Sequence, residues 1–244
     1  MSSTFHPIRY SMITEKNPRE IVMLRGSGCV WRRCRFCDYH LDYSKNILEN
    51  FALNKIQLSK VTGCFGTLEV INSGSFVDLD ENTIALIEDT CLSKQITQVH
   101  FECHWMHRDA ILAFRQRFRI HGITLKLKIG VETFDSLFRE SYLVKGIDTD
   151  SPAAIAAYFD EVCLLQGLPG QSTVQMAKDI ETGLAYFERV CVNIMVENSA
   201  PIKPDPRVVA AFQKELYPRY HSNKRVDILI ENTDFGVGGN TPYV

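Results

Sequence analysis

Residues 28–39 read Gly28-Cys29-Val30-Trp31-Arg32-Arg33-Cys34-Arg35-Phe36-Cys37-Asp38-Tyr39. Their three cysteines have the spacing C-x4-C-x2-C and follow directly on the apolar, strand-like stretch Ile21–Leu24. Thiolates favour zinc and iron–sulfur clusters, so three of them on one short loop indicate a soft metal centre. A structural zinc site is closed by a fourth protein ligand, whereas three ligands leave one metal position free for a small molecule. The loop therefore indicates chemistry at a metal rather than a structural role.

Two other metal sites fit the same spacing. Plant-type [2Fe–2S] ferredoxins combine C-x4-C-x2-C with a fourth, distant cysteine, for which Cys64 is available. Cys64 lies in Val61-Thr62-Gly63-Cys64-Phe65-Gly66, which is typical of a turn between a helix and a strand. A zinc knuckle with His40 as its fourth ligand is the other alternative. We favour a three-cysteine [4Fe–4S] site, because the chain is far longer than an electron carrier needs.

The composition is that of a globular protein without a strong overall charge. The chain has 244 residues, of which 45% are hydrophobic and 23% charged, and its formal net charge is −2. This length fits one large α/β domain. The net charge gives no global electrostatic argument for nucleic-acid binding, so no nucleic-acid partner is expected. Four arginines lie in or next to the cysteine loop: Arg25, Arg32, Arg33 and Arg35. They either form a solvated rim or bind the carboxylate or phosphate of a ligand.

The sequence predicts a cytoplasmic protein that does not bind a membrane. No apolar stretch approaches the roughly 20 residues of a membrane span, and Met1–Tyr10 lacks the apolar segment of a signal peptide. The cysteines outside the loop are scattered through apolar segments without paired spacing, as expected for reduced, buried thiols. They are Cys64, Cys91, Cys103, Cys163 and Cys191.

Short stretches rich in Val and Ile alternate with segments of helical spacing along the chain. The former predict strands covered on both faces: Ile21–Leu24, Thr67–Ile71, Gln98–Cys103, Thr124–Val131, Glu161–Gln166, Val190–Val196 and Val226–Ile230. Apolar residues at helical spacing lie between them: Ile84, Ile87 and Cys91; Ile111, Phe114 and Phe118; Ala177, Ile180, Leu184 and Phe187. Asp78 or Asp80, and Ser172, are expected helix starts.

This alternation predicts a parallel sheet with right-handed crossovers. Six or seven units fall slightly short of a closed eightfold barrel, so we expect an α/β fold with a partial (β/α)6 barrel of the TIM type. We expect a single domain with an N-terminal extension over 1–20 and a barrel core over 21–200. Residues 201–244 would form a C-terminal strand and are a candidate for a lid over the barrel mouth. Active sites of such folds gather at the carboxyl ends of the strands.

The strand, the cysteine loop with Phe36 before its last cysteine, and the repeated β-α units resemble the radical S-adenosylmethionine (SAM) enzymes. The common motif of that superfamily is C-x3-C-x2-C, so this chain departs from it by one inserted residue, a variant that some members share. The run Leu24–Cys34 followed by Phe36–Tyr39 is especially similar to members that act on 7-deazaguanines. That group includes enzymes of archaeosine formation and the small bacterial queuine lyases. The length and the lack of an appended RNA-binding domain favour the queuine lyases.

The resemblance implies two cofactors, a [4Fe–4S] cluster and SAM. Cys29, Cys34 and Cys37 would ligate three irons, and the fourth iron would chelate the amine and carboxylate of SAM. Phe36 would lie beside the adenine. The Gly-rich segment that receives the cofactor amine corresponds here to Asn72-Ser73-Gly74-Ser75, in which polar residues replace one glycine. A simple turn is the alternative interpretation of that segment.

Further cofactor contacts are expected at the ends of three predicted strands. Glu102 and His104 leave the third strand and Glu132 leaves the fourth. Carboxylates there suit the ribose hydroxyls or the ammonium of SAM, and each could equally cap the following helix. Gln166 and Leu168 end the fifth strand, where the superfamily presents backbone groups to adenine.

Substrate residues are expected opposite the cofactor. A guanine-like edge presents N1–H and an exocyclic amine, and one carboxylate can accept both. We expect this carboxylate to be Glu197, Glu231 or Asp234, each of which could also be a surface carboxylate. Asn193 would stand on the same side, and Tyr39 would close the site beside the cysteines.

The resemblance implies a radical SAM lyase of queuosine salvage. A 5′-deoxyadenosyl radical would take hydrogen from the cyclopentenediol of free queuine, and carbon–nitrogen cleavage would release preQ1, the aminomethyl-deazaguanine. The expected partners are this small molecule and a reductant such as flavodoxin or ferredoxin. Three alternatives stay open: an activating enzyme for glycyl-radical enzymes, a tRNA-modifying radical SAM enzyme, and a non-enzymatic iron–sulfur or zinc module.

Overall fold

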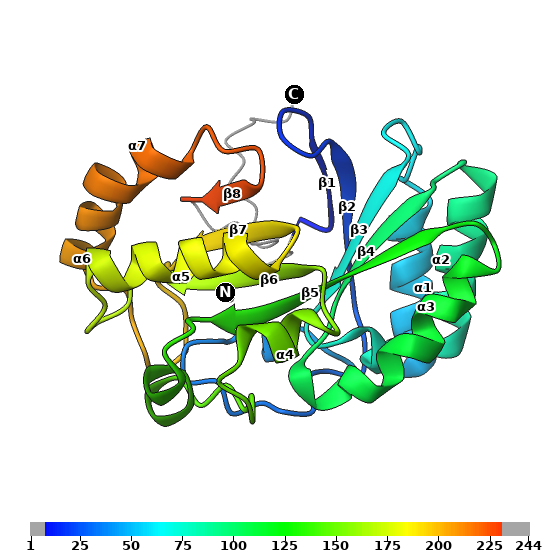
Figure 1. The fold of residues 1–244 in the computed structure, drawn as a ribbon. Coiled ribbons are helices and arrows are strands. Elements are labelled where there is room, and N and C mark those ends of the chain that lie inside the picture. Colours follow the sequence, from blue (N-terminus) through cyan, green and yellow to red (C-terminus); the bar gives the residue numbers. More distant parts are fainter. Residues whose placement is uncertain (1–7, 231–244) are drawn as a thin grey trace.

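The protein forms one curled, eight-stranded sheet in the computed structural model, which describes residues 8–230 (Figure 1). Strand order in the sheet follows the chain, so each strand lies beside its predecessor. β1 pairs antiparallel with β2, and every later pair is parallel. The strands are β1 Tyr10–Ile13, β2 Arg19–Leu24, β3 Thr67–Asn72, β4 Gln98–Glu102, β5 Thr124–Glu132, β6 Glu161–Gln166, β7 Arg189–Ile194 and β8 Val226–Leu229.

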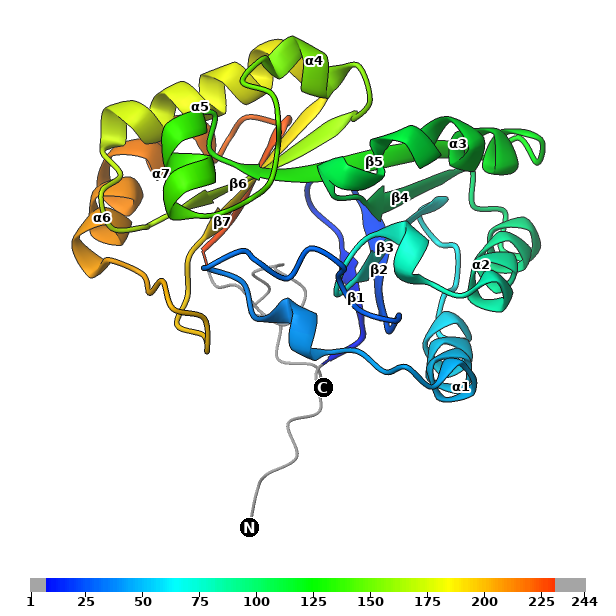
Figure 2. The same ribbon diagram turned by 90° about the horizontal axis from the view of Figure 1, so that it is seen from below.

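The helices cover the outer, convex face of this sheet, which Figure 2 shows as an open arc. They are α1 Ile47–Leu58, α2 Glu81–Ser93, α3 Ile111–Arg119, α4 Pro152–Ala156, α5 Thr173–Tyr186, α6 Pro206–Ala211 and α7 Tyr217–Tyr220. The predicted partial barrel and its strands are thereby confirmed. Asp80 and Ser172 are the N-caps of α2 and α5, accepting hydrogen bonds from Thr83 N and Gln175 N at 3.0 and 3.2 Å.

The main apolar core lies between the sheet and the helices. On β4, Val99 and Phe101 point outward, and Phe101 packs edge-on against Phe114 of α3 with ring centroids 5.0 Å apart. Successive side chains of a strand face opposite sides, so His100 and Glu102 point into the barrel. Within residues 8–230, no helix combines the length and the apolar character needed to cross a membrane.

The inner face of the sheet carries a buried layer of charges near the amino-terminal ends of the strands. All of its members are less than a tenth exposed: Arg19, Glu69, His100, Lys128, Glu161, Arg189 and Asp227. Ion pairs cross the barrel, for example Arg19 to Asp227 between β2 and β8 at 3.6 Å and Arg189 to Asp227 at 2.9 Å. Such pairs require side chains on the concave side. We refer to these seven residues as the ionic layer.

The ionic layer closes the amino-terminal half of the barrel. Burial alone would raise the pKa of Glu69, but Lys128, Arg19 and Arg189 together hold it well below its usual range. Every charge in the layer therefore has an opposite partner at hand. Because this half is filled, a ligand must enter from the carboxyl ends of the strands.

Candidate functional site

The cysteine loop leaves β2 at the carboxyl edge of the sheet and crosses in front of the concave side (Figure 2). Two neighbouring segments hold it. Cys29 N donates to Ser73 O at 3.2 Å, just after β3, and Arg35 N donates to Leu143 O at 3.0 Å. The Trp31 indole donates to Val144 O at 2.8 Å. The loop is thus tied to β3 and to the segment after β5, two positions far apart in sequence.

The thiols themselves are free and half-buried. Cys34 and Cys37 lie against a small apolar cluster that contains Phe36, Leu165 and Leu168. Burial, reinforced by the neighbouring Cys34, raises the pKa of Cys37 to about 12. A buried thiol of this kind becomes a thiolate readily only when a metal ion replaces its proton. The donor set of three thiols therefore fits an iron–sulfur cluster.

A buried lysine stands beside these thiols and was not predicted from the sequence. Lys145 Nζ pairs with Glu132 Oε1 at 2.7 Å and lies 5.6 Å from the centre of the Phe36 ring. Burial opposes its charge, but Glu132 and then Cys34 raise the pKa of Lys145 above its ordinary value. It therefore places a fixed positive charge next to the anionic site. No sequence pattern marks it, because its segment has neither periodicity nor a motif.

Glu132, predicted to bind SAM, is thus the partner of Lys145. Its backbone has φ +69°, at a register shift between β5 and β6. Gly130 lies on the same strand, and an added Cβ would stand 2.4 Å from Glu132 Oε1 and 2.9 Å from Lys145 Nζ, so a side chain there would displace the Glu132–Lys145 pair. A contact from Glu132 to the cofactor stays a prediction.

His104, also predicted to bind SAM, is used to support the cysteine loop. Its Nε2 lies 2.8 Å from Lys145 O, its Nδ1 accepts Met106 N at 3.2 Å, and its ring stacks on Trp31 with centroids 5.4 Å apart. Burial, followed by the charge of Lys145, lowers the pKa of His104 to about 4. Both ring nitrogens are occupied, so the side chain supports the loop instead of offering a free contact to a ligand.

The segment Asn72–Ser75 packs closely on the cysteine loop. An added Cβ at Gly74 would lie 2.2 Å from Asp78 Oδ2 and 3.1 Å from Cys29 Cα, so only glycine fits. Asp78 accepts the Ser75 N–H at 2.7 Å and closes a one-turn helix instead of starting α2. Asn72 Nδ2 donates to Ser75 O at 3.0 Å. The segment is a tight turn beside the first cysteine, and its contact with SAM stays a prediction.

Gln166 and Leu168 are held by hydrogen bonds within the protein, although the buried Gln166 Oε1 has no hydrogen-bond partner among residues 8–230. Gln166 Nε2 donates to Met176 O of α5 at 3.0 Å, so this side chain is directed away from the barrel interior. Leu168 N donates to Gln171 Oε1 at 2.9 Å, and its carbonyl accepts Gln171 N at 3.2 Å. The Leu168 side chain is fully buried and packs in the apolar cluster with Phe36, and a contact of this turn with adenine stays a prediction.

The residues expected around the substrate are not all brought together. Asn193 points into the barrel and is half-buried, with its Oδ1 3.8 Å from Cys191 Sγ. Glu197 is a surface carboxylate, 71% exposed and paired with Lys203 at 3.0 Å. Tyr39 is 43% exposed in the turn after the cysteines. Glu231 and Asp234 lie outside the described residues.

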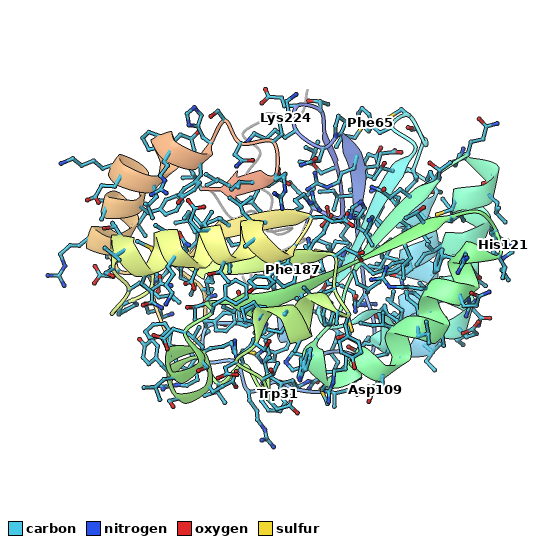
Figure 3. The ribbon with its side chains drawn as sticks, viewed as in Figure 1. Trp31, Phe65, Asp109, His121, Phe187 and Lys224 are labelled. Carbon is cyan, nitrogen blue, oxygen red and sulfur yellow. The ribbon has the colours of Figure 1, made fainter. Side chains whose placement is uncertain are left out.

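The alternative metal sites receive no support. Cys64 precedes β3, whereas the cysteine loop follows the parallel strand β2, so the two lie at opposite edges of the sheet. Figure 3 shows this separation, with Phe65 at the top and Trp31 at the bottom. Within residues 8–230, no three or more His, Cys, Asp or Glu side chains gather as ligands of one metal ion. A zinc knuckle with His40 would need its four ligands around one metal ion. In a [4Fe–4S] cluster each cysteine thiolate binds a different iron, so the thiolates can lie further apart.

Comparison with known proteins gives the family. No family model and no curated protein matches the sequence. Among solved structures, the chain is 40% identical to queuine lyase from Clostridium spiroforme bound to SAM and queuine, with a TM-score of 0.88 over 95% of this chain and 99% of that one. A Bacillus subtilis protein described as a sporulation-specific glycosylase aligns at 11% identity with a TM-score of 0.32, covering 85% and 74% of the two chains. The first similarity spans both chains almost completely, so this protein belongs to the queuine lyase family of radical SAM enzymes.

Proposed function

We propose that this protein is a queuine lyase that uses a [4Fe–4S] cluster and SAM to release preQ1 from free queuine. One observation carries the proposal: the chain matches, almost end to end, a queuine lyase bound to both SAM and queuine. The three-cysteine loop at the carboxyl edge of the partial barrel supports it independently. An oxygen-sensitive cluster also favours a reducing compartment such as the cytoplasm.

Cys29, Cys34 and Cys37 would hold the cluster, with one iron left to bind SAM. Bound there, the cluster and SAM would supply the radical chemistry that removes hydrogen from the cyclopentenediol of queuine. Phe36, backed by the buried Leu168, would give the cofactor an apolar wall, and the turn Asn72–Ser75 brings backbone groups next to Cys29.

The protein's other contribution is to exclude water and fix charge. Lys145 balances part of the negative charge of the thiolates without exposing the site. The ionic layer fills the amino-terminal half of the barrel with paired charges, which keeps water from reaching the cysteine loop from that end.

The test is to measure 5′-deoxyadenosine and preQ1 from anaerobically reconstituted protein given SAM and dithionite, with and without queuine. We expect queuine to stimulate deoxyadenosine formation strongly and preQ1 to appear with it. Slow SAM cleavage at a rate independent of queuine would support the radical chemistry but contradict queuine as the substrate. No deoxyadenosine from fully clustered protein would contradict the proposal as a whole.

Replacing a cluster ligand gives the second test. Cys34→Ala removes one of three iron ligands, so we expect the cluster absorbance and deoxyadenosine formation to be lost together. Cys64→Ala serves as the control, because Cys64 lies at the other edge of the sheet and should leave both unchanged. Deoxyadenosine formation by the Cys34 variant would show that the loop does not carry the chemistry.

A further inference from the structure

Glu102 differs from the other charged side chains that point into the barrel. It lies two residues beyond His100 on β4, so it faces the same way, one level nearer the mouth. The members of the ionic layer are less than a tenth exposed, whereas the Glu102 side chain is 36% exposed. An inward carboxylate with this exposure is reached by solvent from inside the barrel.

The surroundings of Glu102 leave it able to accept hydrogen bonds. Its Oε1 lies 3.2 Å from Lys128 Nζ, and its Oε2 makes no hydrogen bond within residues 8–230. Lys128 already pairs with Glu69. The ionic layer contains three cations, Arg19, Lys128 and Arg189, and three carboxylates, Glu69, Glu161 and Asp227. Glu102 is thus a fourth carboxylate beside these three cations and His100, and Lys128 is its one ion-pair partner within residues 8–230.

The groups around Glu102 are both charged and neutral. Lys128 lies in register with Glu102 on β5, and the Glu132–Lys145 ion pair lies over Gly130 of the same strand. Gly130 of β5 pairs in register with Cys163 of β6, and Cys163 pairs with Cys191 of β7. Both cysteines are buried, and Asn193 lies next along β7 toward the mouth.

We propose that Glu102 is the residue that recognises the deazaguanine edge, accepting hydrogen bonds from N1–H and the exocyclic amine of queuine. A carboxylate with a free oxygen is the side chain that suits two adjacent donors. With the base held there, the cyclopentenediol would point toward the mouth, where the cysteine loop lies. This inference rests on the proposed function and replaces Glu197 as the described carboxylate for that role.

The test compares Glu102→Gln with the wild-type protein by equilibrium dialysis of queuine and of SAM, alongside steady-state kinetics. An amide cannot accept both donors, so we expect queuine affinity to fall roughly 10- to 100-fold and KM to rise in parallel. SAM affinity and cluster content should stay unchanged. Glu188→Gln is the matched control, because Glu188 also pairs with a lysine of β5, Lys126 at 2.6 Å, but on the surface.

An analogue of queuine without the exocyclic amine assigns the contact. Wild-type protein should bind it more weakly than queuine, and the Glu102 variant should discriminate much less between the two. Unchanged queuine affinity in the variant, equal discrimination by both proteins, or a parallel loss of SAM affinity would each overturn the inference. If the Glu102 variant cleaves queuine as well as the wild-type protein does, the inference about Glu102 is wrong and the proposed lyase function stands. If queuine binds through Glu102 but is not cleaved, the lyase function is wrong and the inference stands.

Discussion

At the scale of single residues, the cysteine loop depends on a histidine that stays neutral. His104 connects Trp31 of the loop to the Lys145 carbonyl, and it accepts the Met106 N–H through Nδ1. Protonation of Nδ1 would break that last bond. The predicted role for His104 was contact with SAM, and sequence could not distinguish this from loop support because both place a histidine after a strand.

The free energy of unfolding of the cluster-free protein should depend on pH through the protonation of His104. The folded-state pKa of His104 is lowered from 6.5 to about 4, so its contribution is complete above pH 6.5 and is lost as the pH falls through 4. The full effect is about 3 kcal/mol. We expect His104→Gln to be less stable than wild type at pH 7 and the difference to shrink toward pH 4, measured by urea unfolding. His121→Gln, at an exposed turn, is the control, and a difference independent of pH would contradict the assignment.

At the scale of elements, the sequence predicted the strands to within about two residues at each end. Glu161–Gln166 agrees at both ends, because the strand is buried on both faces and its neighbours are turn residues. β1 was not predicted: Tyr10–Ile13 is a half-buried antiparallel edge strand without an apolar run. The ionic layer was also missed, although a charged residue at the start of an otherwise apolar strand is a signal for it, as Glu161 of β6 and Arg189 of β7 show. A search for apolar stretches passes over such charged residues. Their ion pairs form only when the sheet curls and brings distant strands together.

The junction between the cysteine loop and the segment after β5 is another such element, and Gly146 is its tightest point. Gly146 has φ +76°, and an added Cβ would lie 2.2 Å from the Trp31 ring. Gly122 has a similar φ of +73°, but nothing lies within 4 Å of its added Cβ. The two glycines therefore separate backbone strain from a steric clash.

We expect Gly146→Ala to displace Trp31 and to lower the iron and sulfide bound per chain after anaerobic reconstitution. Gly122→Ala should cost only about 1 kcal/mol of stability and bind a full cluster, because it introduces strain without a clash. Colorimetric iron and sulfide assays, with thermal unfolding of both variants, make the comparison. Equal cluster content in the two variants would show that the Trp31 contact does not hold the loop.

At the scale of the whole molecule, the carboxyl edge of the barrel carries positive charge around the predicted cluster. Arg32, Arg33 and Arg35 are exposed, and all three lie over aromatic rings. The distances to the ring centroids are 4.3 Å from Arg32 to Tyr43, 5.1 Å from Arg33 to Trp31 and 5.7 Å from Arg35 to Tyr142. The chain as a whole is slightly acidic, so this basic edge is a local feature. The two interpretations drawn from the sequence therefore stay open: the arginines form either a solvated rim or a surface for an anionic partner.

An acidic electron carrier such as flavodoxin would approach the cluster over this edge, and charge reversal there tests the idea. We expect Arg33→Glu with Arg35→Glu to slow flavodoxin-supported formation of deoxyadenosine roughly tenfold at low salt, because electrostatic attraction speeds association. The deficit should shrink at high salt, where the charges are screened. Dithionite needs no docking surface, so its rate should persist and shows that the cluster is intact. Arg119→Glu, an exposed arginine at the end of α3, should leave the flavodoxin rate unchanged. If the edge variant and this control responded alike, or if dithionite activity fell equally, the arginines would serve only as a solvated rim or as support for the loop.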